Sequence, residues 1–220
     1  MKIPISGFII SLFLILCLGP AMAQTDTIPE RIPPTRGLRI GVNLSRPLMT
    51  YIEPSRFGVE AMADFNLGYE YFAVAEAGYS YRELEKTSYK LEENGLFIRI
   101  GADRNFYEQF DDVIALGGRL GFSSYNRSAT FIIVHDNYWG GFTGSLPEET
   151  FYKQWAEVVI VLKTELFSNF FLGWNLRGKL LLFGKEDRNM NDRYIPGFGS
   201  SDVNSTASFD FYIYYRFPLK

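Results

Sequence analysis

Hydrophobic and polar residues alternate along most of the chain beyond residue 37. Eight runs show this period of two, which is the pattern of a β-strand with two different faces. The runs are 38–44, 57–65, 69–82, 95–103, 113–123, 155–166, 170–183 and 206–217. In the seventh run, Leu172, Trp174 and Leu176 alternate with polar residues such as Asn175 and Arg177. The pattern predicts an all-β domain of eight strands.

The two faces of these runs differ in their chemistry. The apolar face carries no charged residue in any run, although 21% of the chain is charged. The other face carries glycine and charged residues, and we take fourteen of these, seven of each sign, as candidate lumen charges. They are Arg39, Arg99, Arg119, Lys163, Arg177, Lys179 and Arg216, together with Glu60, Asp64, Glu70, Glu76, Glu157, Glu165 and Asp210.

This contrast bears on which face lies inside a closed barrel. A soluble, lipocalin-like barrel buries its apolar face, whereas a transmembrane barrel turns that face towards lipid. Buried charges need partners of opposite sign, and small residues leave room for long side chains in a narrow lumen. The balanced charges and the glycines therefore favour a charged interior and an apolar exterior, with the soluble barrel as the alternative.

The connections between the runs also differ in length. The short ones are 66–68 and 167–169, the medium one is 104–112, and the long ones are 45–56, 83–94, 124–154 and 184–205. Transmembrane barrels have short periplasmic turns and longer extracellular loops. With both termini periplasmic, eight strands place every long connection outside the cell. We therefore predict an eight-stranded antiparallel transmembrane up-and-down β-barrel over residues 37–220.

One segment within the longest connection is itself strand-like. Residues 128–134 include Thr130, Phe131 and Ile132 in a β-branched and aromatic run. A single added strand would break the alternation of loop lengths. We expect an extracellular hairpin that stands on the barrel, and a count of ten strands is the alternative.

The first residues have the pattern of an export signal. Lys2 precedes an apolar run at 8–18, and small residues at 21–23 supply a cleavage site. The run is too short to span a membrane as a helix. We expect a signal peptide over 1–23, cleaved near Ala23, and an extended, proline-containing lead-in over 24–36. The one cysteine, Cys17, lies in the apolar run, so the mature chain would contain no disulfide.

The last run supplies a resemblance to known proteins. Phe209, Phe211, Ile213, Tyr215 and Phe217 are similar to the aromatic C-terminal signal that the barrel-assembly machinery recognises, although this chain continues to residue 220. Over 37–220 the chain resembles the small OmpA/OmpX-like outer-membrane barrels, and most of all uncharacterised outer-membrane barrels of Bacteroidota classed as a domain of unknown function. The resemblance implies a bacterial outer-membrane location and contact with outer-membrane lipid and lipopolysaccharide. It implies no activity.

Candidate catalytic chemistry is sparse. The formal net charge of −3 gives no basic surface for nucleic acid. The one histidine, His135, stands beside Asp136 in the connection 124–154. Some small outer-membrane barrels are lipid A acyltransferases or deacylases that use a histidine and a serine. A serine nucleophile needs a base within hydrogen-bond reach. No spacing in this sequence marks a serine as the partner of His135. We expect a non-enzymatic protein, with a lipid-modifying enzyme as the alternative.

A metal site and a channel are the remaining candidates. Asp187, Asn189, Asn191 and Asp192 resemble a calcium loop, but Asp192 and Phe198 occupy the positions where that loop needs glycine and glutamate. We expect no metal and no cofactor. The lumen charges would form a salt-bridged filling, with a narrow ion channel as the alternative. The favoured function is an outer-membrane barrel whose extracellular loops bind ligands or associate with other envelope proteins.

Overall fold

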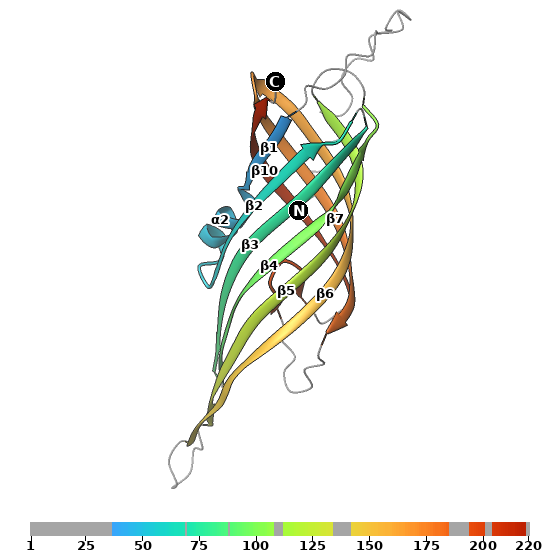
Figure 1. Ribbon diagram of the computed structural model, residues 1–220. Coiled ribbons are helices and arrows are strands. Elements are labelled where there is room, and N and C mark those ends of the chain that lie inside the picture. The colour runs from blue at the N-terminus through green and yellow to red at the C-terminus, as the bar shows by residue number, and fades with distance from the viewer. Residues whose placement is uncertain are drawn as a thin grey trace, which may run out of the picture. The chain divides into compact units, whose positions relative to one another are not determined.

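The computed structural model describes residues 37–68, 70–87, 89–107, 112–133, 142–184, 194–200 and 204–218. Within these ranges the chain forms a closed β-barrel and one short helix (Figure 1). The barrel strands are β1 (Gly37–Asn43), β2 (Arg56–Asn66), β3 (Tyr71–Lys86), β4 (Tyr89–Asn105), β5 (Val113–Ile133), β6 (Phe142–Phe167), β7 (Phe170–Gly184) and β10 (Ser205–Pro218). Helix α2 (Ser45–Ile52) follows β1, and the two-residue strands β8 (Tyr194–Ile195) and β9 (Gly199–Ser200) pair as a hairpin.

The strands are joined in the up-and-down order that the alternating loop lengths predict. Their order around the barrel is β1-β10-β7-β6-β5-β4-β3-β2, and every neighbouring pair is antiparallel. β1 closes the barrel by pairing with both β2 and β10. The structure thus confirms the prediction of eight barrel strands. The alternative of ten is wrong, because residues 128–133 continue β5 and pair with the start of β6.

The two ends of the barrel differ in their connections. At one end, which we call the short-turn end, β2 is joined to β3, β4 to β5 and β6 to β7, and both ends of the barrel chain lie there. In the two-residue turn between β6 and β7, Asn169 has φ 69°, a left-handed conformation that asparagine tolerates. Its carbonyl accepts a hydrogen bond from the Arg216 N–H at 2.8 Å. The opposite end, the loop end, carries the connections β1–β2, β3–β4, β5–β6 and β7–β10, of which β3–β4 has only two residues because its strands extend.

Four strands extend further at the loop end than the hydropathy pattern indicates. Residues 83–94 and 124–154 were expected to be mostly loops, but the β3–β4 and β5–β6 ladders run through most of these residues. β3 to β6 therefore project beyond the other four strands as a curved sheet (Figure 1). The expected hairpin on residues 128–134 is part of this projection.

The outer face of the projecting sheet is polar. Lys90 Nζ lies 2.7 Å from a Glu83 oxygen and 3.0 Å from a Glu92 oxygen, and the Tyr81 hydroxyl donates to Glu83 at 3.1 Å. The hydrogen bonds from Lys90 and Tyr81 hold the pKa of Glu83 below its usual range, and those to Glu83 and Glu92 raise the pKa of Lys90. Charged outward positions explain why the hydropathy alternation ends here although the strands continue.

Candidate functional site

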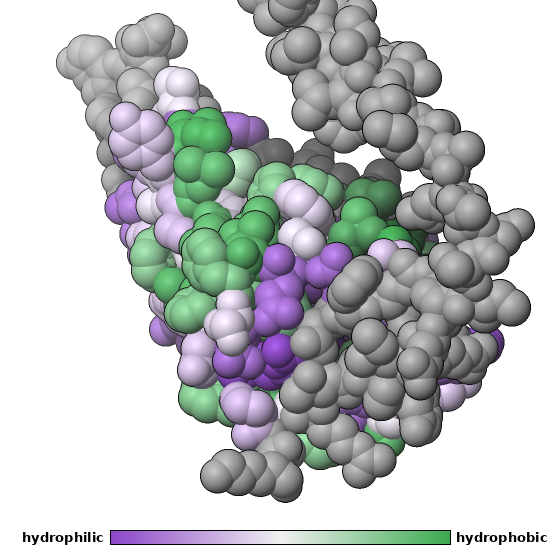
Figure 2. All heavy atoms as spheres, turned by 90° about the horizontal axis from the view of Figure 1, so that it is seen from above, coloured by the Kyte–Doolittle hydropathy of each residue, from purple (hydrophilic) through white to green (hydrophobic). Residues whose placement is uncertain are grey.

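The outer wall of the barrel is apolar, and charged side chains are buried inside it. Ile98 and Leu176 face outward and are 51% and 49% exposed, whereas the adjacent Arg99 and Arg177 face inward and have no exposed surface. We call the outward apolar side chains of the eight strands the belt. In the end-on view of Figure 2, hydrophobic side chains cover much of the visible outer surface and hydrophilic ones gather nearer the middle. The barrel thus has the apolar-outside arrangement, and the soluble alternative with an apolar lumen does not describe it.

The belt has the height and the aromatic border of a membrane-facing surface. From Phe170 to Leu182 on β7 its residues span roughly 30 Å, at about 3.3 Å per residue and a strand tilt near 40°. The exposed aromatic side chains near the short-turn end are Phe65, Tyr71, Phe106, Phe167, Phe170, Tyr215 and Phe217. Transmembrane barrels carry an apolar band about 25 Å tall that ends in such aromatic girdles.

The predicted assembly signal lies on the outer face of β10. Its five residues, Phe209, Phe211, Ile213, Tyr215 and Phe217, are all exposed on the belt. The rings of Phe209 and Phe211 meet edge to face with centroids 4.8 Å apart, as do those of Tyr215 and Phe217 at 4.9 Å. Two aromatic pairs on either side of Ile213 therefore mark the strand that closes the barrel against β1.

Two arginines and three glutamates cross the middle of the lumen. Arg99 contacts Glu60, lies 2.8 Å from Glu76 and lies 3.5 Å from Glu157. Arg177 lies 3.1 Å from Glu76 and 3.0 Å from Glu157. The five side chains are fully buried in these contacts and come from β2, β3, β4, β6 and β7. The ion pairs therefore run across the barrel, not only between neighbouring strands.

Further groups join these five residues into a larger set that we call the central network. Arg119 lies 2.7 Å from Asp103 and 3.3 Å from Glu76, and Arg177 lies 3.0 Å from Asp210. The Tyr212 hydroxyl donates to Glu60 and accepts from Arg177 at 3.0 Å. With Arg46 and Lys179 at its loop-end side, the network has five positive and five negative groups. The positive groups are Arg46, Arg99, Arg119, Arg177 and Lys179, and the negative ones are Glu60, Glu76, Asp103, Glu157 and Asp210.

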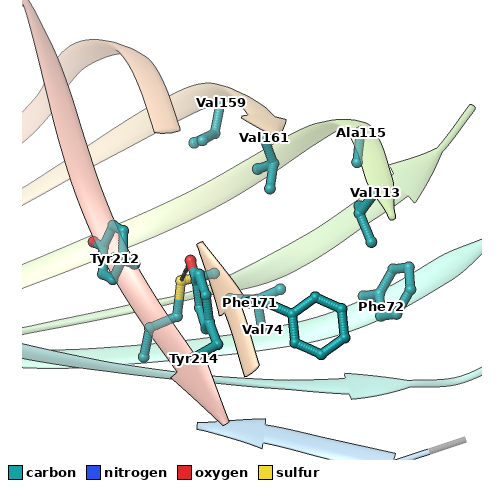
Figure 3. Packing of buried hydrophobic residues seen from close by; sticks show 10 residues of the cluster. Phe72, Val74, Val113, Ala115, Val159, Val161, Phe171, Tyr212 and Tyr214 are labelled. Atoms are coloured by element: carbon teal, nitrogen blue, oxygen red, sulfur yellow. Dashed lines mark hydrogen bonds between the residues drawn. The ribbon is translucent and has the colours of Figure 1, made fainter. Parts of the chain in front are cut away.

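The lumen towards the short-turn end is filled mainly by apolar side chains. The members of this cluster are Met62, Phe72, Val74, Val113, Ala115, Val159, Val161, Phe171, Tyr212 and Tyr214. Figure 3 shows them pointing towards one another from several strands. Asp64 lies beside the cluster, bound by Lys163 and, at 2.7 Å, by Arg39, whose guanidinium carbon is 4.5 Å from the Phe72 ring centroid. The charges here are paired as well as buried.

The β8–β9 hairpin, residues 194–200, closes the lumen at the loop end, and we call it the plug. Phe198 packs edge to face on Trp155 with centroids 5.9 Å apart, in a buried cluster that also contains Phe97 and Ile195. Lys179 Nζ donates to the carbonyl of Gly197 at 2.7 Å and to that of Phe198 at 3.2 Å. Gly197 has φ 79°, and a Cβ there would lie 2.6 Å from the Phe97 ring. A glycine is therefore required where the plug turns.

The structure places most of the predicted lumen charges inside the barrel. Twelve of the fourteen are buried: Arg39, Glu60, Asp64, Glu76, Arg99, Arg119, Glu157, Lys163, Arg177, Lys179, Asp210 and Arg216. Glu165 lies at the short-turn mouth, 3.3 Å from Arg216. These residues belong to one interior filling.

Glu70 is a correction. The sequence pattern placed it on the inner face of a strand that starts at residue 69, but β3 starts at Tyr71. The Asn66 side chain accepts a hydrogen bond from the Gly68 N–H at 2.8 Å and so forms the turn in which Glu70 lies. Glu70 then pairs at 3.1 Å with Arg104, whose side chain is 53% exposed. The apparent alternation continued into the turn by chance.

Several interior charges were not predicted. Asp103 is the last residue of the predicted run 95–103 and lies on its polar face. The alternation could therefore have identified it as an interior charge. Glu93 and Arg127 pair across β4 and β5 beyond the predicted runs, where alternation had ceased. Arg46 belongs to α2 and reaches Glu60 at 3.0 Å. No local signal marks a loop side chain that enters a barrel from outside its strands.

A shallow groove of about 580 Å³ hollows the outer wall where β6, β7 and β10 meet. Small side chains, Ala156, Gly178 and Ala207, form its floor region, and Val158 and Leu180 border it. Because the strand backbones there pair with each other, the groove presents mostly apolar groups. It has the chemistry to accept an alkyl chain.

Two predicted loop candidates cannot be placed. His135 with Asp136, and the aspartates and asparagines of residues 187–192, lie outside the described residues. Among the residues that the structure does describe, no group of three His, Cys, Asp or Glu side chains could hold a metal ion. In the same ranges, no helix is long and apolar enough to cross a membrane.

Fold and interior together define a class of protein: an eight-stranded antiparallel barrel with an apolar outer wall and a plugged, salt-bridged lumen. The family model for a domain of unknown function (DUF6048) matches residues 2–220. The chain belongs to this family.

A second similarity covers part of the chain. Over 110 residues it is 31% identical to the phosphoserine phosphatase RsbU of Bacillus subtilis (strain 168), a match that includes 48% of this chain and 32% of that protein. The chain therefore spans about a third of the length of this curated relative. The phosphatase activity is that of RsbU, and no feature of the barrel interior carries it over.

Proposed function

We propose that the chain is an integral outer-membrane β-barrel protein of a Gram-negative bacterium, of the uncharacterised kind found in Bacteroidota. The observation that carries the proposal is the inverted wall, with the belt outside and the central network inside. Soluble monomers rarely expose continuous apolar surface over more than a few hundred Å². In lipid the same surface is favourable, and β1 closes the barrel by pairing along its whole length with β10 and along most of it with β2.

Export and insertion follow from the two ends of the chain. Residues 1–23 would direct export and be removed near Ala23. The aromatic residues on the outer face of β10 would be recognised by the barrel-assembly machinery. The short-turn end would then face the periplasm, and the loop end would face outward among lipopolysaccharide.

The filled lumen supports a non-conducting, non-enzymatic role. The central network crosses the barrel with paired charges, the plug covers it at the loop end, and the apolar cluster covers it at the other end. Conduction would require water and ions to replace all three. Binding would therefore fall to the loop end, where projecting strands β3–β6 offer a surface for ligands or another envelope protein.

Cell fractionation tests the location. A tagged full-length chain is expressed in a Bacteroidota host, and its membranes are separated on a sucrose density gradient. We expect the protein in the outer-membrane fraction, shortened by about 23 residues by mass spectrometry, and with faster gel migration before boiling than after. Recovery in the soluble periplasm, or in the inner membrane with residues 1–23 retained, would overturn the proposal.

Affinity purification after mild detergent extraction tests the role of the loop end. The same tagged protein is compared with a variant in which the projecting hairpin 124–154 is shortened to a tight turn. An envelope protein that co-purifies with the full chain but not with the variant would support binding at the loop end. Equal recovery of every co-purifying protein in both would contradict it.

A further inference from the structure

Helix α2 stands where the barrel wall lacks a strand. β1 ends at Asn43, and its ladders end at the pairs Asn43–Tyr212 on β10 and Val42–Ala61 on β2. Towards the loop end, β10 continues to Ser205 and β2 to Arg56 without β1 between them. α2 follows directly after β1 and packs against β2 and, more lightly, β10 (Figure 1).

The start of the helix is tied to the neighbouring strand edge. The Leu44 N–H donates to the Phe211 carbonyl at 2.8 Å, and the Phe211 N–H donates to Ser45 Oγ at 2.7 Å. The Asn43 side chain accepts hydrogen bonds from the Ser45 and Arg46 N–H groups at 2.8 and 3.3 Å. Ser45 Oγ thus gives Phe211 a partner that β1 no longer supplies, and the Asn43 side chain caps the first turn of α2.

The polar side of α2 points into the barrel. Arg46 donates to Glu60 from Nη2 at 3.0 Å and from Nε at 3.1 Å, and from Nη1 to the Tyr194 hydroxyl of the plug at 3.3 Å. Arg46 therefore fastens the helix to both the central network and the plug.

The apolar side of α2 points away from the protein. Leu44, Leu48, Tyr51 and Ile52 have the i, i+4, i+7, i+8 spacing of one helix face. Leu48, Tyr51 and Ile52 are 58%, 87% and 67% exposed. A helix on a water-soluble protein has the reverse orientation, with its apolar stripe against the core. The exposed face of α2 is continuous with belt residues such as Val42, which is 55% exposed.

We infer that α2 lies in the outer leaflet of the membrane and completes the wall between β2 and β10, with lipid acyl chains against Leu44, Leu48, Tyr51 and Ile52. The inference rests on the proposed membrane location and adds to it a specific lipid-contacting element. Acyl chains are the occupant that fits, because the face is apolar, adjoins the belt and carries no charge.

Spin labelling tests this contact in the mature chain. Residues 24–220 contain no cysteine, so single cysteines can be introduced without background. A nitroxide is attached to Leu48→Cys or Ile52→Cys in protein refolded into phosphatidylcholine–phosphatidylglycerol vesicles. Collision rates are measured with oxygen, which concentrates in the acyl region, and with a nickel chelate, which stays in water. Ile98→Cys on the belt and Glu92→Cys on the projecting sheet are the matched controls.

We expect the labels at 48 and 52 to collide with oxygen as often as the label at 98, and with nickel far less often than the label at 92. The inference is overturned if 48 and 52 behave like 92 while 98 remains in lipid. If 98 is also accessible to nickel, the membrane proposal fails and the inference fails with it.

A second experiment tests whether Arg46 holds α2 in place. In the Leu48→Cys protein we add Arg46→Gln, or Arg104→Gln at the short-turn end as control. Unboiled gel migration checks that each barrel is closed. We expect the spectrum of the label at 48 to show increased mobility only with Arg46→Gln. An unchanged spectrum in a correctly folded Arg46→Gln protein would contradict the anchoring role.

Discussion

At the residue scale, Arg177 binds four side chains in the described interior. Its guanidinium contacts Glu76, Glu157 and Asp210 and also donates to the Tyr212 hydroxyl. A buried ion pair adds little net stability, because desolvation offsets the attraction, but removal of one partner leaves an uncompensated charge. The network should therefore be sensitive to single substitutions even where its total contribution is small.

Arg177→Met should lower the free energy of unfolding by about 3–5 kcal/mol, since three carboxylates lose a shared cation. The exposed pair of Arg104 and Glu70 provides the comparison, because Arg104→Met should cost about 0–1 kcal/mol. Urea titration in lipid vesicles, followed by tryptophan fluorescence, measures both. Equal losses for the two variants would show that the interior network is not energetically distinct from a surface pair.

Sequence reasoning worked best for single residues inside regular strands. Arg99 and Ile98 are adjacent, and period two was enough to assign them to opposite faces. It failed where a turn imitated alternation, as at Glu70, and where an interior side chain came from a loop, as at Arg46. The local alternation predicts on which face of a strand a side chain lies. It does not predict where a loop places its side chains.

At the element scale, three features depend on contacts between distant residues. The projecting sheet has polar outward positions, so only backbone pairing defines it. Helix α2 has eight residues, includes Pro47 and lies in what the sequence presents as a loop. The plug lies in the expected connection 184–205, and it is held by Lys179 and Trp155 from neighbouring strands. The pattern therefore predicted the closed barrel but not the length of its projecting strands, helix α2 or the plug.

Lys179→Met should release the plug without opening the barrel, because Lys179 donates to two plug carbonyls while the wall ladders remain. Hydrogen–deuterium exchange of residues 194–200 should speed up severalfold, and exchange in β4 should stay slow. Lys163→Met, which alters a buried lysine at the other end of the lumen, is the control. Unchanged exchange at 194–200 would mean that aromatic packing alone holds the plug.

Leu176→Arg should cost about 2–4 kcal/mol in lipid, because it places a charge on the outer face of β7 within the belt. Tyr152→Arg, on an exposed site nearer the loop end of β6, should cost about 0–1 kcal/mol, as expected near the membrane interface. The same urea titration reports both values. If Leu176→Arg is tolerated as well as Tyr152→Arg, the belt does not face hydrocarbon.

At the scale of the whole molecule, the barrel is a closed wall around a filled interior. Apolar cluster, central network and plug follow one another along the lumen, and each is held by side chains from several strands. Such an interior specifies the strand register and leaves the outer surface and the loop end for interaction. This interior supports the proposed role of a membrane scaffold and argues against the alternative of a pore.

Purified protein in planar lipid bilayers should show no step conductance above that of an empty-detergent control. The reason is that the paired charges of the central network cross the described part of the lumen. Single-channel recording at several voltages makes the measurement. Reproducible conductance steps that disappear in Arg177→Met protein would contradict the closed lumen and support the ion-channel alternative.

The contact of the belt with hydrocarbon can be measured most directly at Trp174. This native tryptophan lies on the outer face of β7 against Phe211, whereas Trp155 is buried inside the barrel. The mature chain is refolded into vesicles whose lipids carry bromine on their acyl chains. We predict strong quenching of tryptophan fluorescence relative to unbrominated vesicles, and loss of most of that quenching in Trp174→Phe protein. Quenching that is absent, or that is unchanged in Trp174→Phe, would contradict a lipid-facing outer wall.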